Sequence, residues 1–135
     1  MKQLLSVLAV GALVACSEPF RPTIDDVVGD YTARALTITD STGTRDLLKA
    51  GAVFTLLLLP RGATAGYLYL PATAGDSEVV ADMAGSWTMS EGVILVSQTA
   101  DTFVRDLGFF VEPGRLYGVK TYSLGAVTVR AILTK

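Results

Sequence analysis

The chain contains no histidine and only one cysteine among its 135 residues. Without histidine it lacks the most common metal ligand and the side chain best suited to proton transfer near neutral pH. A lone cysteine excludes an internal disulfide. The sequence also lacks a cluster of metal ligands, a nucleophile with a neighbouring base and a glycine-rich phosphate loop. We therefore predict that the protein is not an enzyme and uses no metal or cofactor.

The chain also has no large excess of either positive or negative charge. Eleven Lys and Arg stand against thirteen Asp and Glu, and the basic residues are scattered singly along the chain. Nucleic-acid binding needs a basic patch, so nucleic acid is not an expected partner. The carboxylates that could pair for acid–base chemistry are Asp25, Asp26, Asp82, Glu91, Asp101 and Asp106. Most of them fall at expected turns or strand ends, where acids are ordinarily solvated.

The longest apolar run before the domain is short. It extends from Leu4 to Val14 and is preceded by Lys2. A helix of this length spans roughly 16 Å, about half of a hydrocarbon core, so it does not predict a transmembrane helix. A positive start followed by a short apolar segment is typical of a secretory leader. The alternative is a buried N-terminal helix of the domain.

The sequence Leu13-Val14-Ala15-Cys16 ends this run. It resembles the lipobox of bacterial lipoproteins. The resemblance implies removal of a leader of residues 1–15, a diacylglyceryl group on the Cys16 thiol and further acylation of its amino group, such as with palmitate. Such chains would hold the protein to a membrane. In that family an Asp after the cysteine favours the inner membrane, so Ser17 points to the outer membrane, facing the periplasm. The alternative is an ordinary signal peptide with an incidental cysteine.

Residues 16–26 are expected to form the lipidated cysteine and a tether. The segment from Ser17 to Asp26 carries two prolines and three acids and shows no periodicity. Ten flexible residues have an r.m.s. reach of about 17 Å, which would keep the following domain close to the membrane. We assign residues 27–135 to one folded domain.

From Val27 onward the hydrophobic period is two, and turn residues interrupt it about every ten positions. Only Arg45–Ala50 is predicted to be helical. The expected strands are Val27–Thr39, Ala52–Leu59, Gly66–Leu70, Ala81–Ser90, Val93–Gln98, Phe103–Glu112, Leu116–Leu124 and Ala126–Thr134. Such short connections favour antiparallel neighbours, and closure removes exposed edges. The predicted fold is all-β, an eight-stranded antiparallel up-and-down barrel; the alternative is an antiparallel β-sandwich.

An internal echo accompanies this pattern. Gly29-Asp30-Tyr31-Thr32 and Gly85-Ser86-Trp87-Thr88 share the order Gly-polar-aromatic-Thr, 56 residues apart, which suggests two four-stranded halves. A strand that opens with Gly-x-aromatic, in a meander behind a lipoprotein leader, resembles the lipocalin-like small lipoproteins of bacteria. Tyr31 stands here for the Trp of the lipocalin Gly-x-Trp motif, and the true Gly-x-Trp occurs at Gly85.

Large side chains on the apolar faces are the candidate ligand contacts. These residues are Tyr31, Trp87, Met89, Phe103 and Phe109, with Arg105 as a charge that shares the apolar face of its strand. An apolar pocket among them would take a small hydrophobic molecule. The alternatives are that they only form the core, and that Arg105 reaches solvent at a barrel rim.

Three readings of the domain remain at this point. The first is an envelope lipoprotein that binds a small hydrophobic ligand. The second is a structural or assembly lipoprotein that binds a protein partner and no ligand. The third, a transmembrane barrel, is disfavoured because several strands are shorter than the roughly 9–11 residues of a spanning strand.

Overall fold

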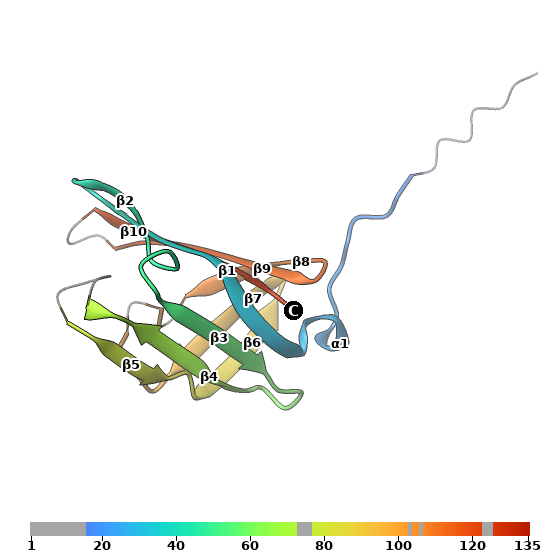
Figure 1. Ribbon diagram of the computed structural model, residues 1–135. Coiled ribbons are helices and arrows are strands. Elements are labelled where there is room, and N and C mark those ends of the chain that lie inside the picture. Colours follow the sequence, from blue (N-terminus) through green and yellow to red (C-terminus); the bar gives the residue numbers. More distant parts are fainter. Residues whose placement is uncertain (1–15, 73–76, 103, 106, 123–125) are drawn as a thin grey trace, which may run out of the picture.

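The computed structural model describes residues 16–72, 77–102, 104, 105, 107–122 and 126–135. Within them the chain folds into one antiparallel sheet that closes on itself (Figure 1). One helical turn precedes the strands, α1 (Ile24–Val27). The strands are β1 (Gly29–Asp40), β2 (Gly43–Asp46), β3 (Val53–Leu58), β4 (Ala63–Leu70), β5 (Val79–Asp82), β6 (Gly85–Ser90), β7 (Val93–Gln98), β8 (Gly108–Glu112), β9 (Arg115–Tyr122) and β10 (Val127–Thr134).

Eight of these strands form a closed barrel, and β2 and β5 are additional. The barrel order is β1, β3, β4, β6, β7, β8, β9 and β10, and β10 pairs with β1 to close it. Neighbours in the barrel are therefore also neighbours along the chain. This is the predicted up-and-down barrel, so the expected fold class is confirmed and the sandwich is not formed.

The strand predicted at Ala81–Ser90 is divided into β5 and β6, yet it holds one register against β4. Asp82 lies opposite Tyr67, and Gly85 lies opposite Thr64, so the same pairing continues across the break. The Met83 amide donates to the Gly66 carbonyl at 3.1 Å within that break. The two short strands thus serve as a single long one.

Two-residue turns join several strands tightly. Glu91 and Gly92 both have positive φ, 52° and 77°, and connect β6 to β7 directly after the Ser90–Val93 pair. Positive φ at both central residues defines the type I′ turn, whose twist matches that of antiparallel strands. The proline-containing turn at Pro113 and Gly114 joins β8 to β9 in the same short way.

One end of the barrel is formed by α1, the β3–β4, β6–β7 and β8–β9 turns, and the C-terminal Lys135. Figure 1 shows α1 and the C-terminus at this end, which we name the α1 end. The opposite end, named the β2 end, carries the β1–β2 hairpin and β5. The interior between the two ends is a single hydrophobic cluster, and every one of its buried members among the described residues lies at Val27 or later.

Two local predictions were wrong. Arg45–Ala50 is not helical: its first two residues belong to β2, and the rest form a turn. The Leu47 amide donates to the Leu36 carbonyl at 2.9 Å, so strand pairing outweighs helix propensity here. The strand expected from Phe103 begins at Gly108. The expected tether contains α1, which leaves only residues 16–23 of it outside regular structure.

The expected division into two four-stranded halves is also wrong. Gly29 opens β1, the first strand of the barrel, whereas Gly85 opens β6, which is the fourth. First and fourth strands of an up-and-down barrel run in opposite directions. The two Gly-polar-aromatic-Thr segments therefore do not mark corresponding strands of a repeat.

Candidate functional site

Three of the candidate ligand contacts lie together inside the barrel. Tyr31, Trp87 and Phe109 are 1%, 4% and 1% exposed and belong to the same hydrophobic cluster. They come from β1, β6 and β8, whose inward positions alternate with outward ones. The faces predicted for these residues are confirmed. Their role as ligand contacts stays a prediction.

The polar tips of two of these rings are bonded to the protein's own backbone. The Tyr31 hydroxyl donates to the Val27 carbonyl at 2.7 Å, and the Trp87 indole Nε1–H donates to the Leu59 carbonyl at 2.9 Å. Burial raises the pKa of Tyr31 to about 12, because the apolar surroundings disfavour the phenolate. The Tyr31 hydroxyl and the Trp87 indole therefore link the barrel interior to the backbone of the α1 end.

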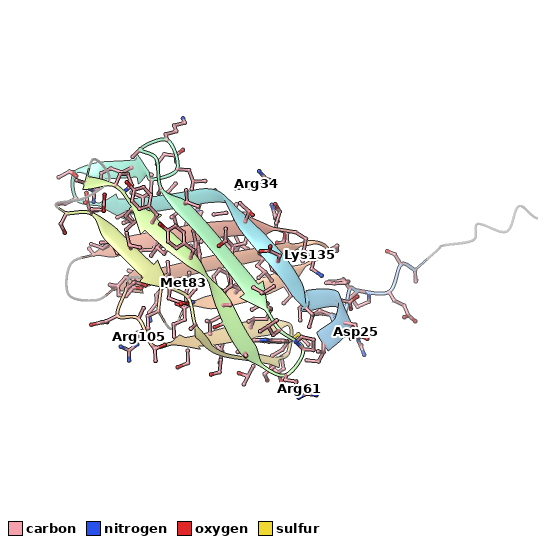
Figure 2. All side chains as sticks on the ribbon, turned by 60° about the horizontal axis from the view of Figure 1, so that its bottom comes forward. Asp25, Arg34, Arg61, Met83, Arg105 and Lys135 are labelled. Carbon is pink, nitrogen blue, oxygen red and sulfur yellow. The ribbon has the colours of Figure 1, made fainter. Side chains whose placement is uncertain are left out.

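Met89 and Arg105 lie elsewhere. Met89 is half-buried at the α1 end of β6, where it lines a hollow with the N-terminal segment. Arg105 is exposed in a turn, with its amide donating to the Thr102 carbonyl, and its side chain points away from the barrel (Figure 2). Its guanidinium lies 3.5 Å from the Asp101 carboxylate. The prediction that Arg105 shares the inner face is thus wrong, because the strand starts after it. Phe103 lies outside the described residues.

Among the described residues, the barrel also buries two polar side chains that were not predicted from the sequence, Thr64 and Gln98. The Thr64 hydroxyl donates to the Met83 carbonyl at 2.8 Å. Gln98 is 5% exposed. Across the residues that the structure describes, neither its buried side-chain oxygen nor the buried hydroxyl of Thr102 has a hydrogen-bond partner. Gln98 is the last residue of β7 and lies on the same inward face of that strand as Ile94 and Val96. Its position, two and four residues after Val96 and Ile94, could have indicated this from the sequence. A Gln on an apolar strand face needs a hydrogen-bond partner for its buried amide.

Three hollows stand out on the described part of the chain. The first, of about 400 Å³, lies at the α1 end between the N-terminal segment and the β6–β7 turn, and is lined by Phe20, Arg21, Pro22, Met89, Glu91 and Gly92. The second, of about 290 Å³, lies on β6 and β7 and is lined by Ser86, Trp87, Thr88, Leu95, Val96 and Ser97. The third, of about 320 Å³, lies over β1, β2 and β10 and is lined by Ala35, Thr37, Thr39, Thr44, Thr128, Arg130 and Ile132.

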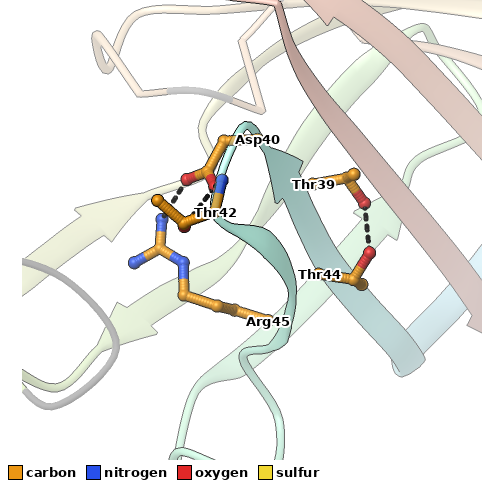
Figure 3. Close-up of polar contacts among 5 residues, drawn as sticks. All are labelled: Thr39, Asp40, Thr42, Thr44 and Arg45. Atoms are coloured by element: carbon orange, nitrogen blue, oxygen red, sulfur yellow. Dashed lines mark hydrogen bonds and ion pairs between the residues drawn. The ribbon is translucent and has the colours of Figure 1, made fainter.

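The hairpin that forms the β2 end is held by its own polar groups (Figure 3). The Asp40 carboxylate accepts from both the amide and the hydroxyl of Thr42 and lies 3.4 Å from the Arg45 guanidinium. The Thr42 hydroxyl contributes most to holding the pKa of Asp40 below its usual value. Across the hairpin, the hydroxyls of Thr39 and Thr44 are 2.8 Å apart. Local bonds of this kind are typical of turns, and we assign them to hairpin stability.

The outer wall carries two groups of exposed apolar side chains. On β7, β8 and β9, Leu95, Phe110 and Val119 are 55%, 55% and 41% exposed, and Leu95 lies opposite Gly108, which has no side chain to cover it. On β3, β4 and β5 the exposed members are Val53, Tyr67 and Val80. Register places Val53 and Val80 on either side of Tyr69. Grouped exposed apolar residues are typical of interaction surfaces.

Cys16 is exposed and unpaired at the start of the described chain. Within the described ranges, His, Cys, Asp and Glu nowhere gather in threes that would hold a metal. In the same part of the chain, none of the helical structure has the length and apolar character needed to cross a membrane.

No protein-family model, curated protein or solved structure matches this chain.

Proposed function

We propose that this protein is an envelope lipoprotein, anchored through Cys16 to the outer membrane and facing the periplasm, with a barrel that acts through its outer surface. The packed interior of the barrel is the observation that supports action through the outer surface. Tyr31, Phe54 and Phe109 are among the largest fully buried side chains, all in one cluster. An eight-stranded barrel is just wide enough for side chains to fill it, so these rings occupy the space where a ligand would lie.

The partner proposed for the outer surface is another envelope protein. Leu95, Phe110 and Val119 offer it an apolar area on three adjacent strands. Protein interfaces concentrate their binding energy in such aromatic and aliphatic anchors.

The anchor is tested by metabolic labelling with an alkyne analogue of palmitate. The wild-type protein should carry the label and begin at Cys16, whereas a Cys16→Ala variant should carry none. Ser17→Ala serves as the matched control and should still be labelled. A wild-type chain that is unlabelled, or cleaved elsewhere, would refute the lipoprotein assignment.

The outer surface is tested by crosslinking in intact envelopes. A partner that crosslinks to the wild type should be lost from Leu95→Ser/Phe110→Ser and retained by Val53→Ser/Val80→Ser, which changes the other wall. Equal recovery with both variants would contradict the assignment to β7–β9.

A second candidate, a small hydrophobic ligand inside the barrel, is favoured by one observation. The unpartnered Gln98 oxygen is the feature that a ligand donor or a water would satisfy. Native mass spectrometry of the unlipidated domain tests it: a retained small molecule that is lost in Gln98→Leu would support interior binding.

A further inference from the structure

Hydrogen bonds at and after Thr23 order α1 and attach it to the barrel. Thr23 and Asp26 form a capping box around α1, with the Thr23 amide donating to the Asp26 carboxylate at 2.7 Å. The Lys135 ammonium donates to the Asp26 carbonyl at 2.6 Å, and the Tyr31 hydroxyl bonds to the Val27 carbonyl. Val27 itself is fully buried. Hydrogen bonds from Thr23 before α1, and from Tyr31 and Lys135 after it, therefore fix the position of α1 on the barrel.

This attachment limits the distance between the barrel and Cys16. Phe20 lies four positions after Cys16, and Thr23 lies seven positions after it. Even a fully extended chain covers at most about 3.6 Å per residue, which gives about 14 Å and 25 Å. A lipid on Cys16 therefore keeps the α1 end close to the membrane surface. The β2 end lies a further strand length away.

The α1 end exposes apolar side chains beside cations. Phe20, Ile24 and Leu59 are 46%, 45% and 37% exposed. Arg21 lines the hollow at the same end. Figure 2 shows Arg61 there together with Asp25 and Lys135. Exposed apolar residues also occur on the barrel wall, so exposure alone does not single out this end. What distinguishes it is that the chain holds it next to the lipidated residue.

The hollow at this end has the mixed character of a lipid interface. Phe20, Pro22 and Met89 give it apolar walls, and Arg21 and Glu91 give it one charge of each sign. Aromatic side chains and arginines are typical of the boundary between headgroups and acyl chains. The bases at this end, Arg21, Arg61, Arg115 and Lys135, are matched by the acids Asp25, Asp26, Glu91 and Glu112. Because the end has no excess of positive charge, a zwitterionic surface fits it better than a strongly anionic one.

We propose that the α1 end is a membrane-contacting face, with Phe20, Ile24 and Leu59 inserted at the acyl boundary and Arg21 and Arg61 on lipid phosphates. The barrel then stands upright on the membrane and directs the β2 end away from it. This inference rests on the proposed lipid anchor at Cys16. It adds an orientation that a flexible tether alone would not impose.

Because Cys16 is the only cysteine, the anchor can be rebuilt chemically. The chain from residue 16 is coupled to a maleimide phospholipid in phosphatidylcholine vesicles whose acyl chains are brominated, and tryptophan quenching is measured. Phe20→Trp places the probe at the α1 end, and Val80→Trp is the matched control on β5. The buried Trp87 contributes an equal background to both variants.

We expect Phe20→Trp to be quenched at least about twofold more than Val80→Trp and to shift its emission to the blue. Adding Ile24→Ser/Leu59→Ser should bring its quenching down to the control level, whereas adding Leu95→Ser/Phe110→Ser should not. Equal quenching at both positions would overturn the membrane face. This readout does not depend on modification in the cell, so its failure is distinguishable from a failure of palmitate labelling.

Discussion

Tyr31 and Trp87 fasten the same end of the barrel from two different strands. Each is the aromatic residue of a Gly-x-aromatic-Thr segment, and each donates from its ring to a backbone carbonyl, Val27 for Tyr31 and Leu59 for Trp87. One bond holds α1 and the other holds the β3–β4 turn. The segments thus share a role in packing although they are not a structural repeat.

The glycines of these two segments are required for different reasons. Gly29 has a φ of 149°, in a region that other residues rarely adopt. Gly85 is required by close approach, because a Cβ atom there would lie 2.1 Å from the Ser97 carbonyl oxygen on β7. A shared sequence pattern therefore arose from two separate local constraints.

The first prediction concerns alkaline pH. The folded protein holds the Tyr31 proton up to a pKa of about 12, whereas an unfolded tyrosine releases it near 10.0. The unfolded state thus binds fewer protons between these values, so stability is fully present below about pH 10 and falls as pH rises to about 12. The loss from this group should be on the order of 2 kcal/mol.

Urea unfolding at a series of pH values measures this loss, and tyrosinate absorbance follows the ionisation. Tyr31→Phe is the control: it should be less stable at pH 7 by roughly 1–3 kcal/mol, because the buried Val27 carbonyl loses its donor. The same variant should show a smaller decline above pH 10. An identical alkaline decline in both proteins would show that Tyr31 is not its source.

The second prediction concerns Gly85. Gly85→Ala forces its new methyl group against the β7 backbone, so we expect destabilisation of about 3 kcal/mol or failure to fold. Gly108→Ala is the matched control, because its nearest contact is the flexible end of Leu95 at 3.4 Å. It should cost less than about 1 kcal/mol. Similar midpoints of thermal unfolding for the two variants would contradict the close packing of β6 on β7.

The third prediction concerns the buried amide. Gln98→Leu replaces an unpartnered oxygen by an apolar group of similar size, so the free energy of unfolding should rise by up to about 1–2 kcal/mol. Thr102→Val tests the unpartnered hydroxyl of Thr102 in the same way. Destabilisation by Gln98→Leu would mean that a bound water or ligand satisfies the oxygen in solution, which would favour the ligand-binding candidate.

The sequence was sufficient to predict the barrel because alternation in the strands is set by burial on one face. It failed where backbone pairing or turns overrode the local pattern. Arg105 follows the parity of Leu107 and Phe109, yet the chain turns between Val104 and Leu107, and these two residues are the ones buried. The parity match at Arg105 was therefore a coincidence of spacing across a turn.

Contacts between distant segments were equally out of reach. Nothing local to Asp26 indicates that the Lys135 ammonium, 109 residues later, bonds to its carbonyl and helps to fix α1. The short helix α1 was therefore not predicted, because the prolines and acids of this segment indicated only a tether. Of the candidate site, burial of Tyr31, Trp87 and Phe109 could be predicted from parity, whereas the partners of their polar groups could not.

The last prediction separates anchoring from folding. Cys16 is exposed and lies eleven residues before Val27, the first buried member of the core. A chain from residue 16 with Cys16→Ala should therefore unfold at the same temperature as the unlipidated wild type, within about 1 °C, because a surface substitution away from packed features changes stability little. In cells the same substitution in the full chain should move the protein out of the outer-membrane fraction. Circular dichroism melting measures the first effect and fractionation the second. If the substitution lowered the melting temperature markedly, the N-terminal segment would be part of the folded core, and its proposed role as an anchor would lose its structural basis.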